Sequence, residues 1–346
     1  MKTAVVLFNL GGPDSLAAVR PFLFNLFNDP AIIGVPQPMR WLLARLISTR
    51  REKFAQANYM RLGGGSPLLP NTRAQAGALS AALETAGLGE ARCFIAMRYW
   101  HPFVAETVTE VMAWQPDRVV LLPLYPQFST TTTGSSLGAW RRAASRLGLT
   151  APTTLACCWP DAGGFVDEIA GLVRPLLDKA RAYGAPRVLF SAHGLPKKVI
   201  ARGDPYQWQV ERTAAAVVAR LAEGSDWRIC YQSRVGPLEW IGPATDDEIR
   251  RAGADGVPVV VVPIAFVSEH VETLVELDVE YAELARHAGV PAWFRAPTVD
   301  ARPAFIAALV GTVRQVLDSG GAVAGPGGRR LCPADRTQCP CAREAA

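Results

Sequence analysis

The stretch VLFSAHGLPKKVIARGDPY, residues 188–206, decides how the rest of the chain is arranged. It begins as an apolar run typical of a buried strand, breaks at Ser191, presents His193 and turns through Gly194 and Pro196. In an open α/β sheet, reactive side chains and ligands gather at the carboxyl ends of the strands. His193 is therefore the first candidate for a functional residue.

Three pairs of segments repeat this strand-like pattern in the same order along the chain. The pairs are residues 6–13 (VLFNLGGP) with 188–196 (VLFSAHGLP), 94–102 (FIAMRYWHP) with 229–237 (ICYQSRVGP), and 119–129 (VVLLPLYPQFS) with 259–268 (VVVVPIAFVS). Continuous apolar runs are expected for parallel strands that are buried on both faces. The repetition predicts an α/β protein of two similar Rossmann-type lobes, each a parallel sheet flanked by helices, with the active-site cleft between them. The alternative is that valine-rich strands look alike in any α/β protein.

Helical patterns lie between these strands and are long enough to connect parallel neighbours. They cover residues 72–86, 105–114, 165–183, 205–222 and 303–317. Because Pro160 and a glycine pair interrupt the pattern, we expect an N-terminal lobe over 1–162 and a C-terminal lobe over 163–318 that carries the functional residues. The last helix of the C-terminal lobe could pack on the first lobe instead. Residues 319–346 are expected to form a flexible linker and a cysteine-bearing tail.

Composition excludes several classes of protein. With 346 residues, 49% of them hydrophobic and 19% charged, the chain is globular and long enough for two cores. The net charge of +5 is small and the basic residues are spread out, so no nucleic acid partner is expected. The start, MKTAVVLFNLGGP, indicates a buried strand and not a signal peptide, and no apolar run reaches the roughly 18 residues of a spanning helix. We expect a cytoplasmic protein, either soluble or peripherally attached to a membrane.

Residues 268–284, SEHVETLVELDVEYAEL, follow the last long strand and have helical periodicity, with Ser268 as the expected N-cap. Glutamates recur along this helix at three- and four-residue steps, at Glu269, Glu272, Glu276, Glu280 and Glu283. A solvated helix face would give the same stripe, but the position beside a strand end favours a functional role for Glu272 and for the neighbouring His270. If His193 faces Glu272, the imidazole and the carboxylate can bind a divalent metal such as Fe(II) or accept protons.

Several strings of residues resemble the ferrochelatase family, and the match covers nearly the whole chain. They are NLGGP (9–13), GGGSP (63–67), RYWHP (98–102), YPQFSTTTTGSS (125–136), FSAHGLP with RGDPY (190–206), QSRVGPLEWIGP (232–243) and PIAFVSEHVETLVELDVEY (263–281). The last three strings are long and specific to that family. The resemblance implies a chelatase fold with a porphyrin cleft between its lobes. It also implies an enzyme that inserts Fe(II) into protoporphyrin IX with release of two protons, as the last step of haem biosynthesis and without a nucleotide cofactor.

The resemblance also implies roles for individual residues. His193 matches the family's active-site histidine, and Glu272 matches its partner carboxylate across the macrocycle, so both are expected to be catalytic and to handle the substrate Fe(II). Which of the two delivers metal and which removes protons is left open. Glu269, His270 and Glu276 match supporting polar residues of the same helix, which the resemblance implies for the passage of protons or metal.

Two further features match regions near the pocket of ferrochelatases. Arg141 matches a pocket-lining position, where its guanidinium would pair with a porphyrin propionate; an ordinary surface arginine is the alternative. Residues 30–51, PAIIGVPQPMRWLLARLISTRR, mix apolar and basic side chains as in an amphipathic helix that lies on a membrane. The matching region forms a lip over the pocket, which implies peripheral membrane attachment. A helix packed on its own sheet would have a similar pattern.

Three of the seven cysteines lie on the tail, at Cys332, Cys339 and Cys341. Their spacing matches no usual zinc site, and a metal centre would need a fourth ligand from the body of the chain. Some ferrochelatases hold a [2Fe–2S] cluster with C-terminal cysteines and one internal cysteine, and this tail resembles theirs. We take Cys158 as the fourth ligand in preference to Cys157, while zinc stays open as the metal.

Other functions are left open by the residues alone. Coproporphyrin could replace protoporphyrin IX as the substrate, and a non-catalytic porphyrin or iron carrier could use the same fold. Cobalt insertion into a corrin precursor is disfavoured because the strings follow the iron enzyme. The sequence gives no oligomeric state, so a homodimer also stays open.

Overall fold

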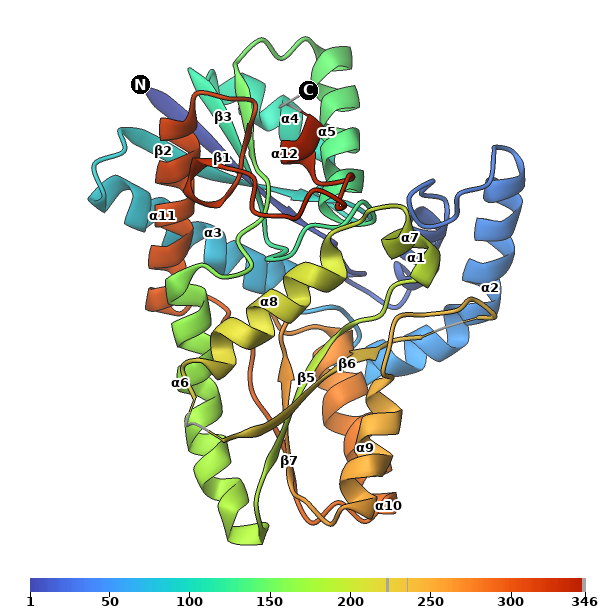
Figure 1. Cartoon of the computed structure of the whole chain (residues 1–346). Coiled ribbons are helices and arrows are strands. Elements are labelled where there is room, and N and C mark those ends of the chain that lie inside the picture. The colour runs from blue at the N-terminus through green and yellow to red at the C-terminus, as the bar shows by residue number, and fades with distance from the viewer. Residues whose placement is uncertain (222–223, 235, 344–346) are drawn as a thin grey trace. The chain divides into compact units, whose positions relative to one another are not determined.

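The computed structural model describes residues 1–221, 224–234 and 236–343 and contains two compact units. The first unit comprises Met1–Cys158 with Leu309–Arg330, and the second comprises Trp159–Ala308 with Leu331–Ala346. Each unit contains one parallel sheet with helices on both of its faces (Figure 1). The predicted α/β class with two parallel sheets is therefore confirmed.

The sheet of the first unit has the strand order β2-β1-β3-β4-β9. Its strands are β1 (Lys2–Asn9), β2 (Glu90–Met97), β3 (Arg118–Pro123), β4 (Thr153–Ala156) and β9 (Val323–Ala324). The helical segments are α1 (Val19–Phe27), α2 (Met39–Met60), α3 (Leu68–Thr85), α4 (Val104–Trp114), α5 (Thr133–Leu147) and η3 (Pro326–Gly328). The residues after Ser319, predicted as a linker, thus also supply an edge strand, because Val323 pairs with Leu155 of β4.

Apolar residues at alternate positions of β1 pack against the helices that cover one face of this sheet. Val6 and Phe8 are fully buried and pack with Val108 of α4 and Trp140 of α5 in one core cluster. The rings of Phe8 and Trp140 lie 6.1 Å apart, centroid to centroid. Burying a side chain of this size stabilises the fold by about 1.5–3 kcal/mol, so the run of apolar residues favours a position for β1 inside the sheet, between β2 and β3.

The sheet of the second unit has the strand order β6-β5-β7-β8. Its strands are β5 (Arg187–His193), β6 (Asp226–Gln232), β7 (Val259–Pro263) and β8 (Trp293–Arg295). The helical segments are α6 (Gly163–Ala180), η1 (Arg181–Tyr183), α7 (Lys197–Ala201), α8 (Tyr206–Val218), α9 (Thr245–Ala254), η2 (Glu272–Glu280), α10 (Tyr281–His287) and α12 (Pro340–Arg343), and α11 (Pro303–Ser319) runs on into the first unit. In Figure 1, α6 and α8 lie on one side of β5, β6 and β7, and α9 and α10 lie on the other.

The two sheets repeat one arrangement of three strands. The order β2-β1-β3 in the first unit corresponds to β6-β5-β7 in the second, and all of these neighbours are parallel. The predicted similarity of the two lobes is confirmed at the level of strand order. The strand β5, which ends at His193, is therefore a central strand, with hydrogen-bonded neighbours on both sides.

The glutamate-bearing helix differs from the expectation in two ways. Ser268 does not cap it, because the helix begins after His270, and the Thr273 hydroxyl accepts a hydrogen bond from the His270 N–H at 3.0 Å. The segment η2 is a π-helix instead of an α-helix, and the Tyr281 N–H donates to the carbonyl of Glu276, five residues earlier. Such wide turns are rare and are often found at functional sites.

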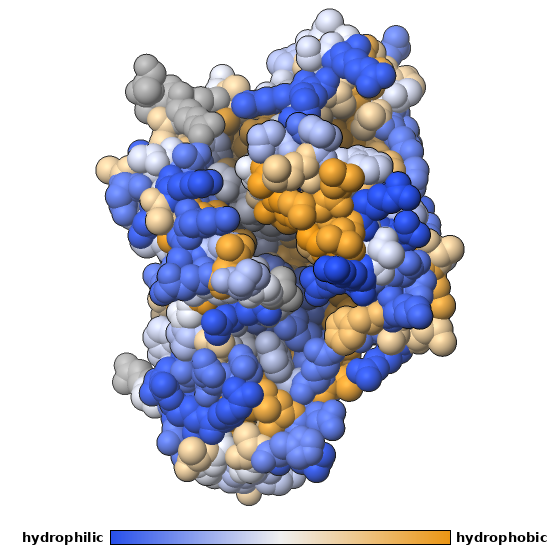
Figure 2. Space-filling view, turned by 90° about the vertical axis from the view of Figure 1, so that its right-hand side faces the viewer, coloured by the Kyte–Doolittle hydropathy of each residue, from blue (hydrophilic) through white to orange (hydrophobic). Residues whose placement is uncertain are grey.

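Helix α2 presents apolar side chains to solvent, although it begins later than predicted, at Met39. Met39 and Leu42 are 58% and 59% exposed, and Trp41 and Leu46 are also exposed. Figure 2, which views the side of the molecule where α2 lies, shows hydrophobic surface bordered by hydrophilic groups. No helix within the described ranges is both long and apolar enough to cross a membrane.

Candidate active site

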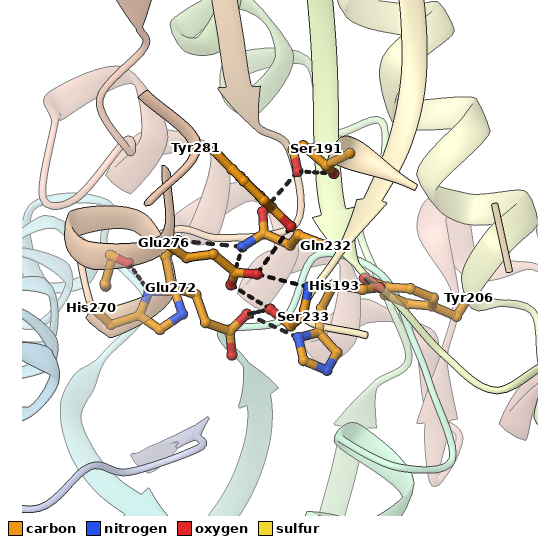
Figure 3. A network of polar contacts seen from close by, with 11 residues as sticks. Ser191, His193, Tyr206, Gln232, Ser233, His270, Glu272, Glu276 and Tyr281 are labelled. Atoms are coloured by element: carbon orange, nitrogen blue, oxygen red, sulfur yellow. Dashed lines mark hydrogen bonds and ion pairs between the residues drawn. The ribbon is translucent and has the colours of Figure 1, made fainter. Parts of the chain in front are cut away.

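The site is built at the carboxyl ends of two neighbouring strands of the second unit. His193 is the last residue of β5, and the parallel register sets it beside Gln232, the last residue of β6. The chain leaves β7 at Pro263 and reaches η2 nine residues later, at Glu272. Three segments that are far apart in the sequence therefore bring polar side chains to one edge of the sheet (Figure 3).

His193 and Glu272 form the central pair of this site. The distance between His193 Nδ1 and Glu272 Oε2 is 2.9 Å, so the two groups are in direct contact. The expectation that a macrocycle lies between them is wrong for this structure, because both side chains leave the same edge of one sheet. Their side chains keep 39% and 20% of their surface exposed, so a substrate can reach both groups. Although burial disfavours the charged imidazole, the Glu272 carboxylate outweighs this effect and raises the pKa of His193. Burial likewise opposes the ionised carboxylate, but His193 overcomes it and lowers the pKa of Glu272 to about 2.

This contact determines which ring nitrogen of His193 can react. An ionised carboxylate only accepts hydrogen bonds, so Nδ1 must carry the proton that lies between the two groups. The other nitrogen, Nε2, is then the basic position of a neutral ring. The Tyr206 hydroxyl donates to the His193 carbonyl at 3.1 Å and holds the end of β5. The pair is thus arranged to accept a proton or a metal at Nε2.

A second carboxylate, Glu276, lies one turn further along η2 and has different surroundings. It accepts hydrogen bonds from the Ser233 N–H at 2.8 Å, from Gln232 Nε2 at 3.0 Å and from the Tyr281 hydroxyl at 3.2 Å. Burial and the nearby charge of Glu272 raise the pKa of Glu276 in spite of these donors. The two glutamates therefore have pKa values shifted in opposite directions, which is how active sites separate an acid from a base.

Ser233 follows β6 in a backbone conformation that is uncommon for serine. Its φ is +61°, in the left-handed region. There its N–H and its hydroxyl both point to Glu276, with the hydroxyl 2.5 Å from Oε2, and the hydroxyl also lies 3.5 Å from Glu272 Oε2. Backbone strain of this kind is often retained where it positions functional groups.

His270 is a second histidine next to this network. It is buried, its ring lies 4.6 Å from that of Phe266, and Nδ1 lies 3.1 Å from the Ser268 carbonyl. Because a carbonyl only accepts, Nδ1 carries the hydrogen and Nε2 keeps its lone pair. Burial lowers the pKa of His270 below that of an ordinary histidine. The group can therefore accept a proton or bind a metal without first losing a proton.

Glu269 has a different set of contacts from the other predicted residues of this segment. Its Oε1 accepts hydrogen bonds from Arg295 at 2.6 Å and from the Thr298 N–H at 3.0 Å. Arg295 also binds Asp278 with two hydrogen bonds of 2.7 Å. Burial alone would raise the pKa of Glu269. The charge of Arg295 and the other hydrogen-bond donors have the larger combined effect and lower the pKa, so the carboxylate is ionised. These contacts tie the start of the segment to β8, and a role in proton or metal passage stays a prediction.

The remaining predicted residues lie apart from this network in the sequence. Arg141 is exposed on α5 of the first unit. Within the second unit, the sulfur atoms of Cys339 and Cys341 lie within 4.8 Å of each other, so part of the tail could hold a metal. Cys332 is buried and accepts a hydrogen bond from Gln209 of α8 at 3.1 Å.

Three residues of the network, Gln232, Ser233 and Tyr281, were not predicted from the sequence. Their roles depend on strand register, on a positive φ and on the π-helical turn, none of which is visible in hydrophobic periodicity. One signal was available in the sequence, because the string QSRVGP stands at the end of β6 as the string HGLP stands at the end of β5. Polar residues directly after a second buried strand of the same sheet are candidates for the same site.

Comparison with solved structures supports the fold. SirB from Bacillus subtilis, solved with Fe3+, superimposes with a TM-score of 0.52 at 13% identity, covering 91% of this chain and 96% of that chain. The sirohydrochlorin chelatase SirB from Bacillus subtilis subspecies spizizenii, in complex with cobalt, has the same TM-score at 11% identity and covers 92% and 97% of the two chains. At these identities the likeness establishes a chelatase-like fold and nothing more specific.

Comparison of sequences identifies the family. The ferrochelatase family model matches residues 2–317. The ferrochelatase of Caulobacter vibrioides (strain NA1000 / CB15N) is 59% identical over 342 residues, which cover 98% of this chain and 97% of the relative. The ferrochelatase of Phenylobacterium zucineum is 58% identical and covers 99% and 98% of the two chains. The chain therefore belongs to the ferrochelatase family and is a metal-chelating lyase.

Proposed function

We propose that the substrate of this ferrochelatase is protoporphyrin IX and that His193, supported by Glu272, accepts the two pyrrole protons one after the other as Fe(II) enters the ring. The observation that carries the proposal is the contact of 2.9 Å between His193 Nδ1 and Glu272 Oε2 at the end of β5. A free-base porphyrin must lose two N–H protons when it binds a divalent metal. A base with a pKa near neutrality is suited to this task.

Each member of the pair has a separate part in this step. Nε2 of His193 accepts a proton from a pyrrole nitrogen, because Nδ1 already donates to Glu272. The negative charge of Glu272 stabilises the imidazolium that forms, which is the role of a carboxylate behind a catalytic histidine. Glu276 and His270 then pass protons or metal onward, because the raised pKa of Glu276 helps its carboxylate to take up a proton and the lowered pKa of His270 helps its ring to release one.

Metal insertion by purified protein tests this proposal. The protein is expected to form protohaem from Fe(II) and protoporphyrin IX, and a fluorescent zinc porphyrin from Zn(II). His193→Ala and Glu272→Gln are each expected to lower kcat by about 10²- to 10⁴-fold, the usual contribution of general acid–base catalysis. His287→Gln, at an exposed histidine of α10, is the matched control and should retain activity.

Two results would count against the proposal. A clear preference for coproporphyrin would show that the substrate is wrong, since the two porphyrins share the ring and differ in their propionates. Binding of porphyrin without metal insertion would favour a non-catalytic carrier. Arg141→Gln is expected to raise KM for the porphyrin if its guanidinium pairs with a propionate.

We also propose that the tail carries a [2Fe–2S] cluster bound by Cys158, Cys332, Cys339 and Cys341, with Cys157 as the alternative to Cys158. Soft thiolates suit an iron–sulfur cluster, and the closeness of Cys339 and Cys341 supports a shared metal. A bound cluster would cross-link the tail to the body of the chain. Visible absorption of freshly purified protein tests this, and Cys158→Ser should lose more colour than Cys157→Ser. Equal retention of colour in both variants would contradict the assignment.

We further propose that α2 attaches this cytoplasmic enzyme peripherally to a membrane. Its exposed Met39, Leu42 and Leu46 alternate with arginines, as in helices that lie at a lipid interface. Sedimentation with vesicles of acidic phospholipid is expected to pull down the protein, and vesicles of neutral lipid should bind less. Leu42→Ser with Leu46→Ser should weaken binding to both kinds of vesicle. Equal binding by this double variant would contradict the membrane role of α2.

A further inference from the structure

We infer that Gln232 is a positioning residue for metal insertion: its buried amide holds the turn of η2 that carries Glu272 and Glu276. The inference rests on the roles proposed above for His193 and Glu272. Gln232 has no exposed surface, so it can act only through the residues it contacts. Figure 3 shows it between the end of β5 and η2.

The amide nitrogen of Gln232 joins two points on the π-helix. Nε2 donates to the main-chain carbonyl of Glu272 at 3.3 Å and to Oε2 of Glu276 at 3.0 Å. An amide has two N–H groups, and both are used here. The side chain of Gln232 therefore fixes both the backbone at Glu272 and the carboxylate of Glu276. Because β6 pairs with β5 up to His193, the same residue also ties η2 to the strand that carries the imidazole.

The orientation of this amide is determined by its other end. The Ser191 hydroxyl donates to Gln232 Oε1 at 2.8 Å, and Ser191 Oγ lies 3.1 Å from the hydroxyl of Thr245. Since a serine hydroxyl has one hydrogen, Thr245 must be the donor to Ser191. Hydrogen bonds thus run in one direction from α9 through β5 and β6 to η2. A flipped amide would bring Oε1 against the main-chain carbonyl of Glu272, with no hydrogen between the two oxygens, and would lose the donor to Glu276.

Loss of the amide would leave two acceptors of η2 without this donor. An acceptor in a buried site that loses its donor is costly, so the turn would shift toward other partners. The carboxylate of Glu272 would move with its main chain and change its position relative to His193 Nδ1. Proton transfer depends on this geometry, and displacements of about 1 Å can lower rates by about 10²-fold. The binding surface for the porphyrin would be unaffected, because Gln232 is not exposed.

Two variants of similar size separate hydrogen bonding from packing. Gln232→Met keeps the volume and removes the donor, and Gln232→Glu replaces the donor by a third carboxylate. We expect Gln232→Met to lower kcat for zinc insertion by about 10- to 100-fold, as is usual for residues that orient catalytic groups, with KM for the porphyrin unchanged. Gln232→Glu should be less active than Gln232→Met at neutral pH, because it brings like charges together.

Matched controls make each outcome decisive. Gln75→Met alters another fully buried glutamine, on α3 of the first unit, and should leave kcat close to the parent. Ser191→Ala removes the anchor of the amide and should lower kcat by a smaller factor; it carries the test if Gln232→Met does not fold. Parental kcat in Gln232→Met, or a change confined to KM, would overturn the inference. If Glu272→Gln abolishes insertion in the same experiment, the proposed function stands although the role of Gln232 fails.

Discussion

At the scale of single residues, the second unit contains two glutamates of the same turn with opposite electrostatic surroundings. Glu272 faces the His193 imidazole and stays ionised, while Glu276 faces neutral donors and has a raised pKa. One carboxylate can therefore stabilise a cation at neutral pH, and the other is better suited to hold a proton. This division follows from neighbouring charges, since both residues are of the same type on the same helix.

The titration of His193 measures this arrangement directly. The chain has only four histidines, so NMR can follow each one. His193 is expected to titrate above the ordinary histidine pKa of about 6.5, because Glu272 stabilises its charged form, and His270 below it, because it is buried. In Glu272→Gln the charge that raises the pKa is gone and burial remains, so the pKa of His193 should fall. An unchanged value would mean that the contact between the two side chains is absent in solution.

Ser233 allows backbone strain to be separated from hydrogen bonding. Ser233→Ala and Ser233→Gly both lose the hydroxyl that donates to Glu276, so we expect equal losses of kcat. Only alanine keeps a Cβ at a φ of +61°, so Ser233→Ala should be less stable than Ser233→Gly by about 1 kcal/mol. Thermal unfolding and zinc insertion on the same samples give both quantities. Equal stability of the two variants would show that the positive φ costs nothing.

The sequence predicts some of these residues and not others, for physical reasons. His193 and Glu272 stand out because one ends an apolar strand and the other lies near the start of an amphipathic helix. Gln232 and Ser233 belong to the same edge of the sheet, but their partners depend on which strands are neighbours. Glu269 lies on the same stripe as Glu272, yet it binds Arg295, a residue of β8 that no local pattern connects to it.

At the scale of elements, the π-helical turn brings the two glutamates together. Periodicity predicts a helix after β7, and a helical segment is there, but its wide hydrogen bonding was not predicted. An apolar face with three- and four-residue steps is compatible with either kind of turn. What decides between them is tertiary contact, since Gln232 and Ser233 bind the inner face of η2 and α9 packs against α10.

The close packing of α9 against the end of α10 can be tested with glycine substitutions. A Cβ on Gly253 of α9 would lie 1.9 Å from the carbonyl oxygen of Ala288, so the two helices would have to move apart. We expect Gly253→Ala to lower the free energy of unfolding by about 1–3 kcal/mol, as for other overpacked contacts. Gly171 of α6 has nothing within 4 Å of the same position, so Gly171→Ala should raise stability by about 0.5–1 kcal/mol. Similar unfolding temperatures for both variants would contradict this packing.

At the scale of the whole molecule, two units with the same strand order carry different chemistry. The strand β1 ends at Asn9, whose amide donates to Thr72 at 3.0 Å, and the corresponding strand β5 ends at His193, which faces a carboxylate. Parallel strands in two similar units were predictable because buried parallel strands have a strong apolar pattern, but the order of the strands within each sheet was not predicted. The chemical difference was predictable only from the residues at the strand ends, where β1 has Asn9 and β5 has His193.

His193 and Glu272 are expected to act as one unit, and a double-mutant cycle on kcat for zinc insertion tests this most directly. The parent, His193→Ala, Glu272→Gln and the double variant are compared, with porphyrin binding measured by fluorescence to confirm that each protein is folded. If the two side chains act together, the double variant will be no slower than the more damaged single variant, as in other catalytic groups that function as a unit. If the losses of the two single variants multiply in the double variant, the two residues act independently and the central claim is wrong.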